Sequence, residues 1–73
     1  MFAQDLEVGD VIKIPGWMLH DDLAGLQFEI TAKKIERENG RVFVTHGPDA
    51  DEARTWFRDD EPITLIGHQE PNP

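Results

Sequence analysis

Residues 31–46 read TAKKIERENGRVFVTH, and the Asn39-Gly40 pair in this stretch is the strongest indicator of local structure in the chain. Asn-Gly supplies the two positive-φ residues that a type I′ hairpin turn requires. We therefore predict a tight hairpin that joins a strand around residues 31–37 to a strand over residues 41–46. Because side chains alternate along a strand, Val42 and Val44 are expected to face one way and Phe43 the other.

Upstream of the hairpin, Phe28, Ile30 and Ala32 alternate with polar residues, which is the pattern of a half-buried strand. The next apolar residue, Ile35, comes three positions after Ala32 instead of two, so the alternation slips by one residue. A slip of this kind turns side chains to the opposite face unless the backbone absorbs it. We therefore expect a bulge or a sharp bend near Lys33-Lys34.

Three further strands are predicted from short alternating or β-branched runs. They cover residues 11–14 (VIKI), 54–58 (RTWFR) and 63–66 (ITLI). The polar residues 58–62 predict a short 3-10 turn before the last strand. A helix of one or two turns is predicted over residues 19–25, in the long first loop. Residues 67–73 contain two prolines and no large apolar side chain, so they predict a flexible C-terminal tail.

This order predicts an all-β fold, a small five-stranded barrel that forms one domain over residues 1–66. A bend in a strand lets the sheet close on itself and remove its edges. In this layout the chain resembles the SH3-like barrel superfamily over residues 6–66. Residues 6–12 (LEVGDVI) look like the opening of such barrels, and residues 56–63 (WFRDDEPI) look like their strand, short 3-10 turn and final strand.

The resemblance does not carry over binding of proline-rich peptides. Signalling SH3 domains line the groove for such peptides with tyrosines, and this chain has no tyrosine. Compact acidic barrels of this kind are also similar to accessory proteins of tailed bacteriophages. That similarity implies docking on a larger assembly of phage or host proteins.

Length and composition exclude several classes of protein. A chain of 73 residues makes one domain with a thin core. It has no cysteine, so neither a disulfide nor a thiolate metal site is available. A membrane-spanning helix needs about 20 consecutive apolar residues, and no apolar run in the chain is nearly that long. The first residues lack the basic region and apolar core of a signal peptide, so we expect a cytoplasmic location.

The chain is acidic, with 15 acidic against 7 basic residues and a net charge of −8. Domains that bind nucleic acid through phosphates are usually basic, so this balance disfavours nucleic acid as a partner. An acidic surface favours a partner protein with a basic surface. Six residues would steer such a partner: Asp21, Asp22, Asp49, Asp51, Asp59 and Asp60. The alternative is that the acidic residues only keep the domain soluble.

No catalytic, metal or cofactor site is predicted. The chain has no serine, and its threonines all fall within predicted strands, where no base is placed to activate a hydroxyl. His20-Asp21-Asp22 and Asp49-x-Asp51-Glu52 contain metal-ligand types. Adjacent residues on one loop rarely converge on a closed zinc site, and the second run lacks the length and the glycine of a calcium loop. His46 and His68 are expected at the surface.

Two patches are predicted to bind a partner. Arg54, Trp56 and Arg58 share one face of a strand, opposite Thr55 and Phe57, and an exposed tryptophan between arginines is the composition of an interface hot spot. The alternative is that Trp56 faces the core. The second patch is Trp17, Met18 and Leu19, which either plugs the barrel end or protrudes as an apolar contact. The need to bury area favours the plug.

We therefore expect a non-catalytic protein-protein interaction module. Two alternatives stay open. Trp56 and its arginines could stack and bind single-stranded nucleic acid despite the overall charge. The acidic surface could instead mimic nucleic acid and block a basic site on another protein.

Overall fold

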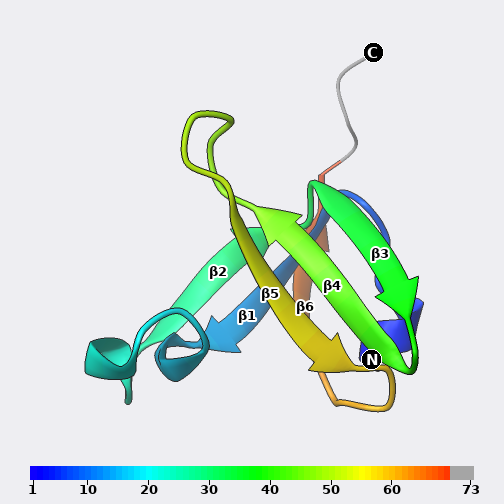
Figure 1. Ribbon diagram of the computed structural model, residues 1–73, viewed down its shortest axis with the longest axis horizontal. Coiled ribbons are helices and arrows are strands. Elements are labelled where there is room, and N and C mark those ends of the chain that lie inside the picture. Colours follow the sequence, from blue (N-terminus) through cyan, green and yellow to red (C-terminus); the bar gives the residue numbers. More distant parts are fainter. Residues whose placement is uncertain (70–73) are drawn as a thin grey trace.

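The computed structural model describes residues 1–69, and within that range the chain folds into two antiparallel three-stranded sheets (Figure 1). The first sheet has the order β2-β1-β6 and is formed by β1 (Asp10–Pro15), β2 (Gln27–Thr31) and β6 (Thr64–His68). The second has the order β3-β4-β5 and is formed by β3 (Lys34–Glu38), β4 (Arg41–His46) and β5 (Ala53–Arg58). Three short 3-10 helices accompany them: η1 (Ala3–Asp5), η2 (Gly16–Met18) and η3 (Asp21–Leu23).

The all-β prediction is confirmed, but the five-stranded closed barrel is wrong. Residues 1–69 hold six strands in two sheets, and no ladder joins the sheets into a barrel. The reason is that the bend expected near Lys33-Lys34 is a complete break. The N–H of Ala32 donates to Asp10 in the first sheet at 2.9 Å, whereas the N–H of Lys33 donates to Thr45 in the second at 2.8 Å. One predicted strand therefore becomes β2 and β3.

The predicted hairpin is confirmed. Asn39 and Gly40 have φ angles of 52° and 75°, and Glu38 of β3 pairs with Arg41 of β4 across the turn. Val42 and Val44 are buried, while Phe43 on the opposite face is partly exposed, as the alternation predicted. The hairpin therefore fixes the register of the second sheet.

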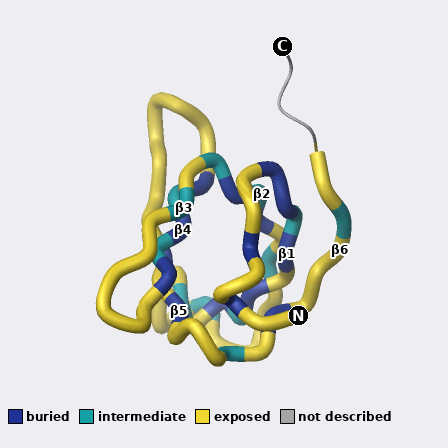
Figure 2. Tube along the Cα trace, turned by 90° about the vertical axis from the view of Figure 1, so that its right-hand side faces the viewer, coloured by how far each residue is buried: buried dark blue, intermediate teal, exposed yellow. Residues whose placement is uncertain are grey.

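Buried positions recur at every second residue along β1, β4 and β5 (Figure 2). The core is aliphatic apart from one aromatic ring, Phe57, which is 1% exposed. Its ten buried apolar residues within the described range are Ala3, Leu6, Ile12, Ile14, Ile30, Ala32, Val42, Val44, Phe57 and Ile63. Both sheets contribute to it, so each sheet buries one face.

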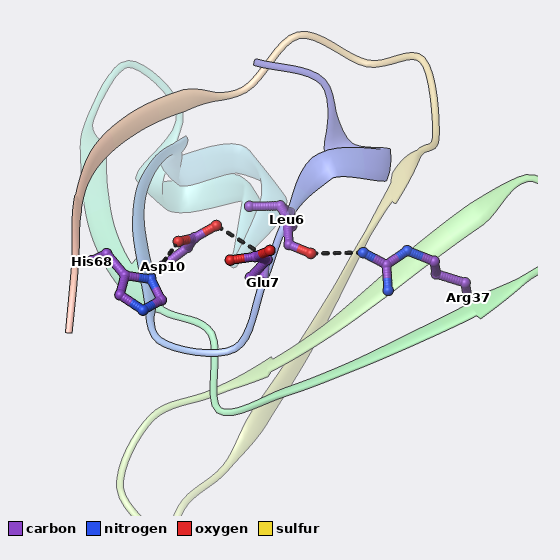
Figure 3. A network of polar contacts seen from close by, with 5 residues as sticks. All are labelled: Leu6, Glu7, Asp10, Arg37 and His68. Atoms are coloured by element: carbon purple, nitrogen blue, oxygen red, sulfur yellow. Dashed lines mark hydrogen bonds and ion pairs between the residues drawn. The ribbon is translucent and has the colours of Figure 1, made fainter. Parts of the chain in front are cut away.

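A polar network holds the N-terminal segment against both sheets (Figure 3). The carboxylate of Asp10 accepts a hydrogen bond from the Glu7 N–H at 2.9 Å and lies 2.7 Å from Nδ1 of His68 on β6. Arg37 of β3 donates to the carbonyl of Leu6 at 2.6 Å. The contact of Asp10 with His68 lies beyond residue 66, where the domain was predicted to end.

The predicted tail over residues 67–73 is therefore wrong at its start, because Gly67 and His68 belong to β6. The N–H of Gln69 also donates to the carbonyl of Gly9 at 2.7 Å. The rest of the predicted tail, residues 70–73, lies outside the described residues.

The turn predicted before the last strand is present, but it does not form a 3-10 helix. Within the described residues this segment is a turn closed by the Glu61 N–H and the Arg58 carbonyl at 3.1 Å. The carbonyls of Asp59 and Glu61 accept instead from the N–H groups of Gln4 and Ala3, so they do not continue a helix.

In the long first loop, the helix expected over residues 19–25 is present only as the single turn η3, with Gly25 after it at a φ of 89°; η2 precedes that range. Both are 3-10 helices, closed by i→i+3 hydrogen bonds from the Leu19 N–H to the Gly16 carbonyl and from the Ala24 N–H to the Asp21 carbonyl. Across residues 1–69 no helix has the length and apolar character needed to cross a membrane.

Candidate interaction groove

Strand β5 presents Arg54, Trp56 and Arg58 outward and buries Thr55 and Phe57. Trp56 is 49% exposed, which confirms its predicted orientation and excludes the alternative in which it faces the core. Phe57 fills the interior instead, because neighbouring side chains in a strand point to opposite faces.

The register of the second sheet places Phe43 of β4 directly beside Trp56 of β5. Arginines cover both rings. The guanidinium carbon of Arg41 lies 4.8 Å from the centroid of the Trp56 ring, and that of Arg54 lies 4.4 Å from the centroid of the Phe43 ring. At these distances a guanidinium is attracted to the electron-rich ring face. Arg54 also contacts the carboxylate of Glu36 at 3.2 Å.

This outer face of the second sheet is basic although the chain is acidic. Its exposed charged residues are four cations, Lys34, Arg41, Arg54 and Arg58, and two anions, Glu36 and Glu38. It therefore holds more than half of the 7 basic residues of a chain with net charge −8. Sequence reasoning missed Arg41, because its place over Trp56 depends on the strand register.

The two patches predicted separately meet in one groove. Trp17 and Met18 of η2 line it on one side, and residues of β5 line it on the other. The groove has a volume of about 650 Å³, and its complete lining within the described residues is Trp17, Met18, Arg54, Thr55, Trp56, Arg58 and Glu61. A volume of this size falls in the range of ligand-binding clefts.

The expectation that residues 17–19 plug the interior holds only for Met18, which packs partly buried against the core. It is wrong for Trp17, which is 60% exposed, and for Leu19, which is also exposed and does not line the groove. Successive residues of a 3-10 turn point about 120° apart, so only one of three can face the core. Gly16 fixes the turn, since a Cβ there would lie 2.1 Å from the carbonyl oxygen of Leu23.

The six aspartates proposed to steer a partner are all exposed, but none of them lines the groove. Asp21 and Asp22 lie on η3, Asp49 and Asp51 in the β4–β5 loop, and Asp59 and Asp60 in the turn after β5. Asp49 is also paired with Lys33, and this hydrogen bond lowers the pKa of Asp49 and raises the pKa of Lys33. Electrostatic steering of a partner by the other five aspartates stays a prediction.

The expectation that His46 lies at the surface is wrong. Its side chain is buried, and Nε2 lies 3.0 Å from Oγ1 of Thr55. His46 shares the inward face of β4 with Val42 and Val44, so the alternation contained the signal. Burial lowers the pKa of His46 because it disfavours the charged imidazolium.

His68 is exposed as expected, although it contacts the buried Asp10. Nδ1 of His20 accepts from the N–H of Asp22 at 3.2 Å, so it caps η3. In residues 1–69 no three His, Asp or Glu side chains gather closely enough to hold a metal ion.

No protein family, curated protein or solved structure matches this chain.

Proposed function

We propose that this chain is a non-catalytic protein-interaction module that holds a partner protein in the groove between η2 and β5. One observation carries the proposal: the chain has two tryptophans, Trp17 and Trp56, and both are exposed in this groove. Exposed tryptophan beside arginine is the composition of interface hot spots. A domain with a thin core would gain more from burying both rings inside.

The proposal keeps the SH3-like resemblance at the level of layout. The chain passes from one three-stranded sheet to the other at Ala32 and Lys33, and the groove lies beside the long first loop. A small domain of this kind suits an accessory role in a larger assembly of phage or host proteins. Proline-rich peptides are not part of the proposal.

The lack of an accessible hydroxyl nucleophile in the groove supports a non-catalytic role. Thr55 supplies the groove's one hydroxyl group and contacts the imidazole of His46. Thr55 is only 5% exposed and His46 only 6%, so a substrate atom has little access to this pair. Within residues 1–69 no third group is hydrogen-bonded to the imidazole of His46 to orient it as a base.

Binding of single-stranded nucleic acid is the weaker candidate, although the outer face of the second sheet is basic. A nucleobase would need the outer ring faces of Trp56 and Phe43 for stacking. Arg41 and Arg54 already cover these rings. The net charge of −8 would also repel a polyanion with one phosphate per nucleotide at long range, more strongly than a segment with two carboxylates.

Capture of partner proteins with groove variants tests the proposal. The wild-type chain, Trp17→Ala, Trp56→Ala and the control Leu65→Ala are immobilised and incubated with lysate of the source cell. Leu65 is an exposed apolar residue of β6, on the other sheet and outside the groove. We expect a protein that the wild type and Leu65→Ala retain and both tryptophan variants lose. Equal retention by all four folded chains contradicts the proposal.

A further inference from the structure

Strand β5 is an edge strand of the second sheet, and its outer edge runs along the groove. The sheet order is β3-β4-β5, so one side of β5 pairs with β4 and the other has no strand beside it within residues 1–69. The groove is lined by residues of β5 and η2 but by none of β4. An edge of this kind presents a row of backbone donors and acceptors.

The hydrogen bonds of β4 show which backbone groups of β5 point away from β4, toward the free edge. The carbonyl of Thr45 accepts from Lys33, so the odd-numbered residues of β4 bond toward β3. Bonding direction alternates along an antiparallel strand. The even-numbered residues of β4 therefore bond toward β5, where Val44 pairs with Thr55.

It follows that the N–H and C=O groups of Arg54 and Trp56 point away from β4. No hydrogen bond to these four groups is found within the described residues, whereas the carbonyl of Arg58 accepts from the N–H of Glu61. Backbone groups of this kind bond either water or another strand. The groove thus combines an unpaired strand edge with two tryptophan rings.

The side chains on this edge define what a neighbouring strand must carry. Arg54, Trp56 and Arg58 share one face at intervals of two residues. A strand added beside β5 places its own residues directly opposite them, where opposite charges and apolar pairs are stabilising. The matching pattern is acid–x–apolar–x–acid. It is symmetric, so it fits in either strand direction.

A second copy of this chain does not fit the edge. Antiparallel pairing of two β5 strands about Trp56 would place Arg54 of one copy opposite Arg58 of the other, and like charges directly opposite are destabilising. The sequence also contains no two acidic residues four positions apart. No segment of this chain therefore carries the matching pattern.

We propose that β5 receives a strand from another protein, an extended segment with the pattern acid–x–apolar–x–acid, as the fourth strand of the second sheet. This inference rests on the proposed function and adds the conformation and the sequence pattern of the partner. Two carboxylates pair with Arg54 and Arg58, and the apolar side chain packs beside Trp56. The intervening side chains point to the opposite face of the strand, where Thr55 and Met18 line the groove.

Titration with synthetic peptides tests the inference, with the fluorescence of Trp17 and Trp56 as the signal. The probe is the heptapeptide Thr-Glu-Val-Phe-Val-Glu-Thr. One control peptide has lysine in place of both glutamates. A second keeps every side chain but carries an N-methyl group on the phenylalanine nitrogen, which removes a donor to the edge. We expect saturable binding of the probe and at least about tenfold weaker binding of both controls.

Two protein variants complete the test. The double variant Arg54→Gln with Arg58→Gln should weaken binding of the probe at least about tenfold, because both charge-assisted contacts are lost. The control Lys13→Gln removes an exposed cation from β1, on the other sheet, and should leave binding unchanged.

Failure of this inference is distinguishable from failure of the proposed function. If the probe does not bind at millimolar concentration, or binds no better than the two control peptides, strand addition is overturned. If tryptophan-dependent capture from lysate persists in that case, the proposed function stands without it. If a labelled single-stranded oligonucleotide binds in a salt-sensitive way and the probe does not, the nucleic-acid alternative replaces both proposals.

Discussion

Trp17 of η2 and Trp56 of β5 line the same groove, although η2 directly follows β1 of the first sheet and β5 belongs to the second. The two sheets share no ladder within the described residues. A partner bound between the two rings would therefore contact both halves of the fold. Because such a partner binds only the folded chain, it would also stabilise that chain by mass action.

Trp56 and Phe57 are neighbours with opposite exposure, so their alanine variants should separate binding from stability. Trp56→Ala should change the free energy of unfolding by about 1 kcal/mol or less, because the ring is half exposed. Phe57→Ala should cost about 3–5 kcal/mol, because it empties the core of its aromatic ring. Urea denaturation followed by circular dichroism measures both. A larger loss for Trp56→Ala would contradict the orientation of β5.

Gly9, Gly40 and Gly67 differ in the space that is available for the methyl group of an alanine. Gly40→Ala should cost about 1–2 kcal/mol, because its φ is positive and its surroundings are open. Gly9→Ala should cost about 1–3 kcal/mol more, since its Cβ would also lie 2.2 Å from the Gln69 carbonyl oxygen. Gly67→Ala is the control, with nothing within 4 Å. Thermal unfolding measures the loss of stability of each of the three variants. Equal losses for Gly9→Ala and Gly40→Ala would contradict the contact with Gln69.

The parts of the fold that local chemistry controls could be predicted from the sequence. Asn39-Gly40 specifies its own turn, and that turn sets which residues of β4 are buried. The alternation around Trp56 likewise gave its outward orientation. His46 was expected at the surface because its side chain is polar. Its position in the alternation of β4, however, is inward.

The rest depends on contacts between distant segments. The break at Ala32 and Lys33 follows from the partners of each half, Asp10 in one sheet and Thr45 in the other. No local pattern reveals those partners, so one strand was expected where there are two. The meeting of Trp17 with Trp56 in one groove is likewise a property of the folded chain.

Asp10 should contribute more to stability than His68, which it contacts. Asp10→Ala leaves the Glu7 N–H and the imidazole of His68 without their acceptor, at a cost of about 2 kcal/mol. His68→Ala should cost less, because the carboxylate keeps the Glu7 N–H and the exposed imidazole is replaced by water. Urea denaturation at neutral pH measures both free energies of unfolding. A cost for His68→Ala equal to that of Asp10→Ala would place the main contact at the histidine.

Burial of His46 predicts that the fold loses stability in mild acid. The pKa of His46 in the folded chain lies below its ordinary value of 6.5, because burial disfavours the imidazolium. Above pH 6.5 the imidazole is neutral in both the folded and the unfolded chain, and its contribution is fully present. As the pH falls below 6.5, the unfolded chain binds the proton first, so the free energy of unfolding decreases until the pH reaches the folded pKa.

His46→Gln should reduce this decrease, because glutamine does not titrate and still offers a hydrogen-bonding group to Thr55. The control is His20→Gln, since His20 is exposed and should leave the decrease as it is in the wild type. Urea denaturation of the three chains between about pH 7 and pH 5, where aspartates and glutamates stay mostly ionised, isolates the histidine. If His46→Gln loses as much stability as the wild type over this range, the pH dependence arises elsewhere and the buried imidazole is not its source.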